Sequence, residues 1–243
     1  MTMRAPGTEL PICLSDVTVE THGVTILDRI TLALGSGPPT VLIGPNGSGK
    51  TTLLRIAMGL ILPSAGTVTW GGRESVAPVR RAIVFQHPVM LRRTAAENLR
   101  YALKVSGRLP RKMYDSRIAE LLSLVGLSEF GDRPARTMSG GEKRRLALAR
   151  ALAGDPAVLF LDEPSASLDP AAAKVVEDVI RTVAARNIKV VMSTHDLGSA
   201  RRLAGDIIFM HRGRVVETGA ASTFFNEPHS DEAKIFIRGD LLV

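Results

Sequence analysis

Residues 44–51 read G-P-N-G-S-G-K-T and match the pattern G-x-x-x-x-G-K-[ST] of a phosphate-binding loop. The apolar run at 40–43, just before the loop, has the length and character of a strand buried on both faces. Leu53, Leu54 and Ile56 after the loop continue as a helix. A strand, a glycine-rich loop and a helix in this order are the context that the motif requires, and they predict an α/β fold with a mostly parallel sheet.

Each residue type in this loop has a physical role. Gly44, Gly47 and Gly49 permit backbone conformations in which successive N–H groups point at phosphate oxygens. Lys50 is expected to bridge the β- and γ-phosphates, and the Thr51 hydroxyl to ligate Mg²⁺. The residues predicted to bind the nucleotide are Gly44, Pro45, Asn46, Gly47, Ser48, Gly49, Lys50, Thr51 and Thr52.

The composition of the 243 residues is that of a soluble globular protein, with 45% hydrophobic and 23% charged residues. No apolar run approaches the roughly 18 residues of a membrane span, and 1–11 lack the pattern of a secretory signal, so we expect a cytoplasmic protein. The net charge of +7 predicts contact with an anion. With 4% aromatic residues, nucleic acid is not an expected partner. The single cysteine, Cys13, lies between apolar residues and is expected to be buried.

Hydrophobic periodicity predicts alternating strands and helices along the rest of the chain. We expect one domain over 1–243, with a catalytic α/β core, an N-terminal antiparallel part, an inserted helical subdomain and a short C-terminal tail. The core comprises 12–87 and 156–220, the helical subdomain 88–155 and the tail 221–243. Strands are predicted at 17–19, 30–34, 66–70, 83–85, 157–161 and 189–193, and helices at 118–125, closed by Gly126, and at 170–186.

The sequence V-L-F-L-D-E at 158–163 is an apolar strand that ends in two adjacent carboxylates. The side chains of adjacent residues at a strand end point in different directions, so the two carboxylates can have different roles. Asp162 is predicted to hold Mg²⁺, and Glu163 to act as the general base on the attacking water. The alternative is a pair of solvated acids in the turn before Pro164.

Residues 138–142, M-S-G-G-E, predict an S-x-x-E capping box at the start of a helix. Ser139 would cap the helix and Glu142 would reach back to the cap. The cap does not explain Gly140 and Gly141, which lower helix propensity where the helix begins. Two glycines beside an exposed helix N-terminus invite the close approach of an anion.

From about residue 12 to residue 228 the chain resembles the ATP-binding subunits of ABC transporters. The resemblance rests on the order and spacing of a set of motifs. They are G-P-N-G-S-G-K-T at 44–51, Gln86, M-S-G-G-E-K-R-R at 138–145, V-L-F-L-D-E-P-S at 158–165, S-L-D at 167–169, and His195 in S-T-H-D. It implies a P-loop NTPase (RecA-like) core that takes ATP and Mg²⁺.

The resemblance also implies a head-to-tail homodimer with two ATP molecules between the chains. Each ATP would be held by the phosphate loop of one chain and by Ser139, Gly140, Gly141 and Glu142 of the other. Gln86 would contact Mg²⁺ and the attacking water. His195 would contact the γ-phosphate, the alternative being a polar histidine with a structural partner. Asp169 would line the dimer interface and is equally a helix cap before Pro170; both roles can hold.

The chain departs from the pattern of that family in three respects. Met138 and Glu142 stand where Leu and Gln are usual, and Glu142 adds a negative charge near a phosphate site. This charge is expected to weaken the contact with the γ-phosphate by a few tenths of a kcal/mol up to about 1 kcal/mol. The aromatic residue that usually stacks on adenine is missing, which leaves His22 or another group to cover the base.

The resemblance implies an ATP-hydrolysing subunit bound to the cytoplasmic side of a bacterial inner membrane. Its partners would be transmembrane permease subunits and, indirectly, an extracytoplasmic solute-binding protein. An oxyanion importer of the tungstate or molybdate type is the substrate prediction, with phosphate and polar amino acids as alternatives. A soluble ABC ATPase of an assembly system is the alternative from another class. Residues 87–93 are expected to dock a permease helix, unless they are ordinary surface.

Overall fold

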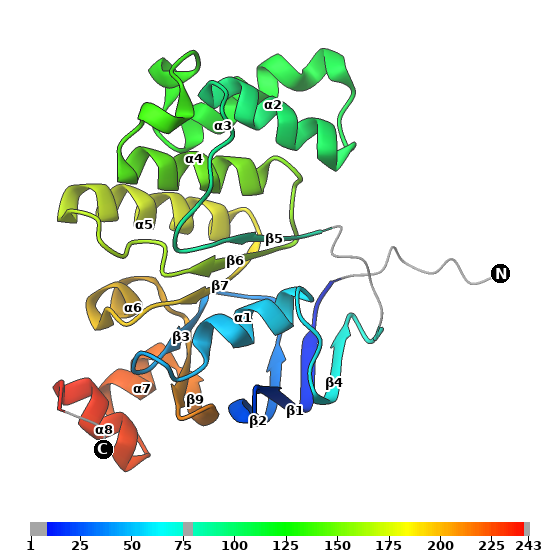
Figure 1. The fold of residues 1–243 in the computed structure, drawn as a ribbon. Coiled ribbons are helices and arrows are strands. Elements are labelled where there is room, and N and C mark those ends of the chain that lie inside the picture. Colours follow the sequence, from blue (N-terminus) through cyan, green and yellow to red (C-terminus); the bar gives the residue numbers. More distant parts are fainter. Residues whose placement is uncertain (1–8, 75–79, 241–243) are drawn as a thin grey trace. The chain divides into compact units, whose positions relative to one another are not determined.

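The computed structural model describes residues 9–74 and 80–240 (Figure 1). By their internal contacts they form two compact units. The first unit comprises Met1–Pro78 and Lys189–Val243, and the second comprises Val79–Ile188. The phosphate loop and His195 therefore belong to the first unit, while Gln86, Ser139 and the two carboxylates belong to the second.

The N-terminal part of the first unit is an antiparallel sheet in the order β2-β1-β4. Its strands are β1 (Ile12–Thr21), β2 (Val24–Leu34) and β4 (Ala65–Trp70). His22 and Gly23 join β1 to β2 with positive φ angles of 51° and 77°, as a two-residue hairpin turn requires. The Trp70 indole is buried and donates to the Ala57 carbonyl at 2.7 Å. The predicted antiparallel part is confirmed.

Cys13 is half-buried, so the expectation of a buried thiol was wrong. Ile12 and Leu14 on either side of it are fully buried. Successive side chains of a strand point to opposite faces, so Cys13 lies on the face of β1 opposite to these two residues.

The rest of the first unit consists of mostly parallel strands and of helices. Its central strand β3 (Thr40–Ile43) lies between β7 (Lys189–Ser193) and β8 (Asp206–His211), both parallel to it. Every residue of β3 and β7 is buried, as a strand covered on both faces should be. The antiparallel β9 (Arg214–Ala220) pairs with β8. The helices of the unit are α1 (Lys50–Met58), α6 (Leu197–Leu203), α7 (Ala221–Asn226) and α8 (Asp231–Arg238).

The described part of the second unit, 80–188, combines two parallel strands with four α-helices. Strands β5 (Arg81–Val84) and β6 (Val158–Asp162) pair in register from Arg81 with Val158 to Val84 with Leu161. The helices are α2 (Ala95–Ser106), α3 (Tyr114–Leu124), α4 (Gly140–Leu152) and α5 (Pro170–Ala185), with single 3₁₀ turns η1 (Arg111–Met113), η2 (Ser128–Phe130) and η3 (Ala135–Thr137). Gly126, with φ of 64°, follows α3 as predicted.

Two predicted strand limits in this unit were shifted. Phe85 was expected within the first strand but lies beyond β5 with 39% of its surface exposed. The second strand runs one residue further than expected and includes Asp162. The α/β class is confirmed, and α2, α3 and α4 fall within the predicted helical insertion; the exact domain limits stay a prediction. No helix within 9–74 and 80–240 is long and apolar enough to cross a bilayer.

Candidate active site

The phosphate loop leaves the end of β3 and enters α1 through three glycines with positive φ. Gly44, Gly47 and Gly49 have φ angles of 147°, 77° and 98°. A Cβ on Gly44 would overlap the carbonyl oxygen of Met210, and one on Gly49 would lie 2.7 Å from a methyl carbon of Leu27. Both positions therefore need glycine for its backbone freedom and for its lack of a side chain.

The start of α1 is arranged for an anion. Gly49 is its N-cap and provides no side-chain hydrogen bond to the helix, and the first turn carries no acidic residue. The N–H groups of a helix start point outward and carry the positive end of the helix dipole. Such a site attracts phosphate.

Lys50 and Ser48 supply polar side-chain groups at this cradle. Lys50 is 7% exposed, and its ammonium donates to the carbonyls of Gly44 at 2.8 Å and Pro45 at 2.9 Å, across the mouth of the loop. The Ser48 hydroxyl is buried and has no hydrogen-bond partner among the described residues. A buried hydroxyl without a partner is costly, so a ligand oxygen at this place would satisfy it. The residues present therefore fit a nucleotide phosphate.

His195 lies at the same sheet edge as the loop. β7 pairs in parallel with β3, and the N–H of Thr194 donates to the carbonyl of Leu42 at 3.0 Å. Gly44 and His195 each follow within two residues of these paired strand ends. In parallel sheets ligands bind at this edge, and the exposed His195 is positioned accordingly. Thr51 and Thr52 lie in the first turn of α1 and are half-buried.

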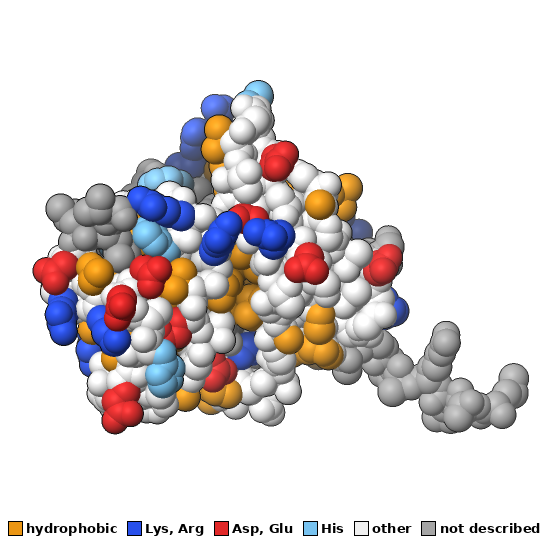
Figure 2. All heavy atoms as spheres, turned by 90° about the horizontal axis from the view of Figure 1, so that it is seen from below, with side chains coloured by type: hydrophobic (Ala, Val, Ile, Leu, Met, Phe, Trp, Pro, Cys, Tyr) orange, Lys and Arg blue, Asp and Glu red, His pale blue; other side chains and the backbone are white. Residues whose placement is uncertain are grey.

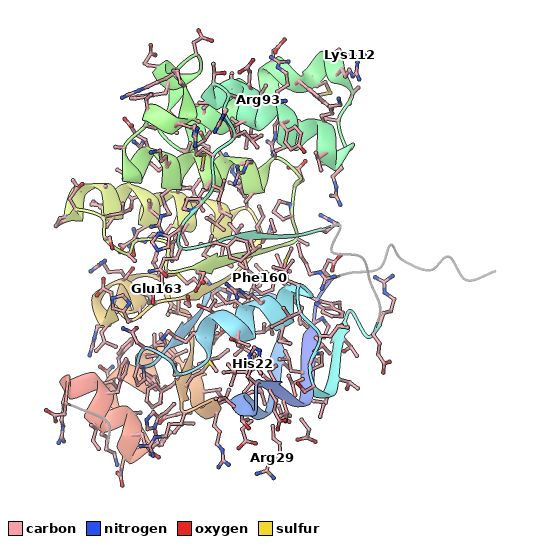
Figure 3. The ribbon with its side chains drawn as sticks, in the orientation of Figure 1. His22, Arg29, Arg93, Lys112, Phe160 and Glu163 are labelled. Atoms are coloured by element: carbon pink, nitrogen blue, oxygen red, sulfur yellow. The ribbon has the colours of Figure 1, made fainter. Side chains whose placement is uncertain are left out.

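The second unit gathers its site residues at the carboxyl ends of β5 and β6. Asp162 closes β6 and Glu163 follows it; both are buried, with 5% and 9% of their surface exposed. Gln86 follows the neighbouring β5 by two residues. Figure 3 shows Glu163 at the end of its strand, beyond Phe160. Burial argues against the alternative of two solvated acids in a turn.

The predicted capping box at α4 is confirmed. The N–H of Glu142 donates to the Ser139 hydroxyl at 3.3 Å, and the N–H of Ser139 donates to the Glu142 carboxylate at 2.7 Å. The hydrogen bond from the Ser139 N–H is the main cause that holds the pKa of Glu142 below its usual range. The other carboxylate oxygen lies 3.5 Å from the guanidinium of Arg133. Sequence reasoning missed Arg133, because nothing in the spacing of nine residues predicts the contact.

The two glycines at this helix start differ in their surroundings. A Cβ on Gly141 would lie 3.2 Å from the Cβ of Ala172, so close packing of α4 on α5 explains this glycine. A Cβ on Gly140 would meet no described atom within 4 Å. Packing therefore does not explain Gly140, and the close approach of an anion there stays a prediction.

Asp169 caps α5, as one of its two predicted roles requires. Its carboxylate accepts from the N–H groups of Ala171 at 3.0 Å and Ala172 at 2.9 Å, and Pro170 stands at the first helical position. Its place in a dimer interface stays a prediction.

His22 is exposed in the turn between β1 and β2. Its contact with adenine also stays a prediction.

No cluster of three or more His, Cys, Asp or Glu side chains suited to a metal occurs in the described part of the chain. Mg²⁺ is usually held by one or two carboxylates together with water and phosphate oxygens. Within the second unit, the buried carboxylate of Asp162 and the amide of Gln86 are groups of the kind that this mode uses.

A phosphate loop at the end of a central parallel strand, with a carboxylate pair at the end of another strand, defines a nucleotide-hydrolysing α/β protein. Residues 27–166 match the family described as ABC transporter. The phosphate import ATP-binding protein PstB 2 of Natronomonas pharaonis is 37% identical over 90% of this chain and 84% of its own length. The tungstate uptake system ATP-binding protein TupC of Peptoclostridium acidaminophilum is 38% identical over 89% of this chain and 100% of its own length.

A solved structure agrees with these matches. The ATP-binding cassette MJ0796, as a dimer in a post-hydrolysis state with ADP and Pi, covers 86% of this chain and 98% of its own, with 26% identity and a TM-score of 0.79. The chain belongs to the ABC transporter family. It is an ATPase of that family, and its nucleotide is ATP with Mg²⁺.

Proposed function

We propose that the chain is the ATP-hydrolysing subunit of a membrane importer and works as a head-to-tail homodimer. The observation that carries the proposal is the exposed start of α4 in a chain that already has one phosphate loop. Ser139 and Gly140 are exposed there, with space in front of Gly140. If two chains bind each ATP, one chain contributes its phosphate loop and the other must contribute a second anion-binding helix start. The start of α4 is suited to that role.

In this proposal each predicted site residue has a separate role in binding or hydrolysing one ATP. Gly44 to Thr52 hold its phosphates, with Lys50 on the β- and γ-phosphates, and Ser139, Gly140, Gly141 and the Glu142 cap come from the second chain. Thr51, Gln86 and Asp162 would hold Mg²⁺, which neutralises phosphate charge when bound. Glu163 accepts the proton of the water whose oxygen attacks the γ-phosphorus, with ADP as the leaving group, and Gln86 and His195 position that water.

The transported solute is proposed from the relatives alone. One relative is named for phosphate and another for tungstate, and both are oxyanions. We propose an oxyanion, with tungstate first and phosphate or a polar amino acid as the alternatives.

The surface charges on one face give no support to nucleic-acid binding. On the face in Figure 2, Lys and Arg side chains lie among Asp and Glu side chains and form no continuous basic patch along which a nucleic acid could bind.

A groove beside β5 suits the docking of a permease helix. It has a volume of about 340 Å³ and is lined by Phe85, Pro88, Val89, Ala147 and Arg150, among others. Val89 is 77% exposed, and its carbonyl accepts from the Arg150 guanidinium at 2.8 Å, which fixes the segment while leaving its side chain outside. An apolar groove with a basic rim fits a short amphipathic helix. Docking there would hold the chain at the cytoplasmic face of the membrane as a peripheral subunit.

Co-purification tests the importer proposal. The tagged chain is expressed in its native host and isolated in mild detergent, and polytopic membrane proteins are identified in the eluate. Val89→Asp is expected to reduce their recovery at least about tenfold, since a charge in an apolar interface remains desolvated. Val105→Asp, at another exposed valine of the same unit, is the control and should retain them. Recovery of a soluble partner without membrane proteins would contradict transport and favour an assembly ATPase.

The charge of Glu142 gives a second prediction. The nearby Arg133 offsets that charge, so Arg133→Gln should raise the ATP concentration for half-maximal hydrolysis about two- to fivefold. Glu142→Gln should lower it by a similar factor, because the amide oxygen can still accept from the Ser139 N–H while the negative charge is removed. In the Glu142→Gln background, Arg133→Gln should change nothing. An equal effect of Arg133→Gln in both backgrounds would show that Arg133 acts independently of Glu142.

A further inference from the structure

Arg144 joins helix α4 to the turn that carries Glu163. It is 6% exposed. One terminal nitrogen, Nη1, donates to the carbonyl of Glu163 at 2.6 Å, and Nη2 donates to the carbonyl of Ala166 at 3.3 Å. A guanidinium offers donors in a fixed planar fork, so two bonds from one group set the distance between their acceptors. Arg144 therefore clamps both ends of the turn 163–166.

The conformation of Glu163 explains why this turn needs a clamp. Glu163 has a φ of 48°, in the left-handed region that residues with a side chain seldom occupy. Its carbonyl also accepts from the N–H of Ala166 at 3.2 Å, which closes the turn. A sparsely populated backbone conformation persists only where the surroundings over-determine it, and such residues cluster at active sites. Arg144 supplies such a constraint from outside the turn.

The burial of Arg144 has a cost that packing does not require. Burial lowers its pKa and the charge of Glu163 opposes that change, yet an arginine remains protonated. An apolar side chain would fill the same space without losing hydration. Arg144 lies on the buried face of α4, where Leu148, four residues further along, is fully buried. A charged group here is thus explained by its two acceptors.

We infer that Arg144 is a positioning residue for ATP hydrolysis, which fixes the backbone of Glu163 so that its carboxylate reaches the attacking water. The inference rests on the proposed role of Glu163 as general base. A shift of about 1 Å at such a group can reduce the rate about a hundredfold. Arg144 makes no contact with ATP in this proposal, so nucleotide affinity should not depend on it.

Arg144→Gln and Arg144→Lys test the inference in the full-length chain. Arg144→Gln is expected to lower kcat roughly ten- to hundredfold, with the affinity for ATP within about twofold of the original. Arg144→Lys should recover part of kcat, because an ammonium can bond one of the two carbonyls. Arg145→Gln is the matched control: the neighbouring Arg145 also donates to two backbone carbonyls, those of Val125 and Gly126 at 2.9 and 2.8 Å, but away from Glu163. It should leave kcat within about twofold.

A double variant separates this inference from the proposed function. If Arg144 acts through Glu163, adding Arg144→Gln to Glu163→Gln should cause no further loss of hydrolysis. Normal kcat in a folded Arg144→Gln, alongside loss of hydrolysis in Glu163→Gln, would overturn the inference and leave the proposed function standing. Normal hydrolysis in Glu163→Gln would overturn the role of Glu163 itself. If Arg144→Gln does not fold, Arg144→Lys decides: unchanged kcat and unchanged ATP affinity at lowered thermal stability would show a purely structural role and overturn the inference.

Discussion

Glu163→Gln is expected to bind ATP with unchanged affinity while its turnover falls roughly a hundred- to ten-thousandfold. Glutamine has the shape of glutamate and fits the same buried position at the end of β6, so the turn and its bond from Arg144 should persist. Its amide cannot accept the proton of the attacking water. We propose that ATP binding holds the two chains together and that hydrolysis lets them separate, so the ATP-bound dimer should accumulate in this variant.

Steady-state phosphate release and size-exclusion chromatography with and without ATP measure the two effects. Glu120→Gln serves as the control, since Glu120 is a surface acid of the same unit that pairs with Arg117 and Arg186. Its replacement should leave turnover within about twofold. Turnover of Glu163→Gln near that of the original chain would refute Glu163 as the base.

Lys50→Ala is expected to weaken ATP binding by about ten- to a hundredfold, since hydrogen bonds to charged groups contribute about 1.5–3 kcal/mol each. The ammonium of Lys50 is fixed at the mouth of the phosphate loop by the carbonyls of Gly44 and Pro45. Removing it leaves the anion site with the N–H groups of the loop and helix and the Ser48 hydroxyl, and without a positively charged side chain. Unlike Glu163→Gln, this variant should fail to form an ATP-dependent dimer.

A fluorescent ATP analogue titrated into each variant measures this affinity. Lys174→Ala is the control, because Lys174 is an exposed lysine on α5 that pairs with Asp178. Its affinity should match that of the original chain. Equal affinities for Lys50→Ala and Lys174→Ala would contradict the assignment of the phosphate loop.

Much of the site was predictable because its determinants are local. The strand, loop and helix around 44–51 follow from consecutive residues, and so do the capping box of Ser139 with Glu142 and the cap of Asp169. Each of these features connects residues at most a few positions apart, where periodicity and capping rules apply.

The features that sequence reasoning missed depend on tertiary contacts. Arg144 and Glu163 are separated by 19 positions and meet only because α4 packs near the end of β6. The left-handed backbone of Glu163 has no signature, since glutamate is not a residue chosen for that region. Cys13 was expected to be buried, but it is half-buried, because apolar neighbours reveal the character of a strand and not which of its faces is covered. Arg144 lies four residues before the apolar Leu148 and so on the same face of the predicted helix. This spacing could have indicated that Arg144 is buried.

Mixing two variants tests most directly whether one ATP is shared by the phosphate loop of one chain and Ser139 of another. One variant carries Lys50→Ala and the other Ser139→Arg, and both carry Glu163→Gln so that bound ATP is retained. The measurement is radiolabelled ATP retained after rapid filtration. Neither variant alone should retain ATP, whereas the mixture should retain about one ATP per mixed dimer, because one of its two sites combines the intact loop with the intact Ser139. A mixture that retains none, while Glu163→Gln alone retains about two per dimer, would contradict the shared site.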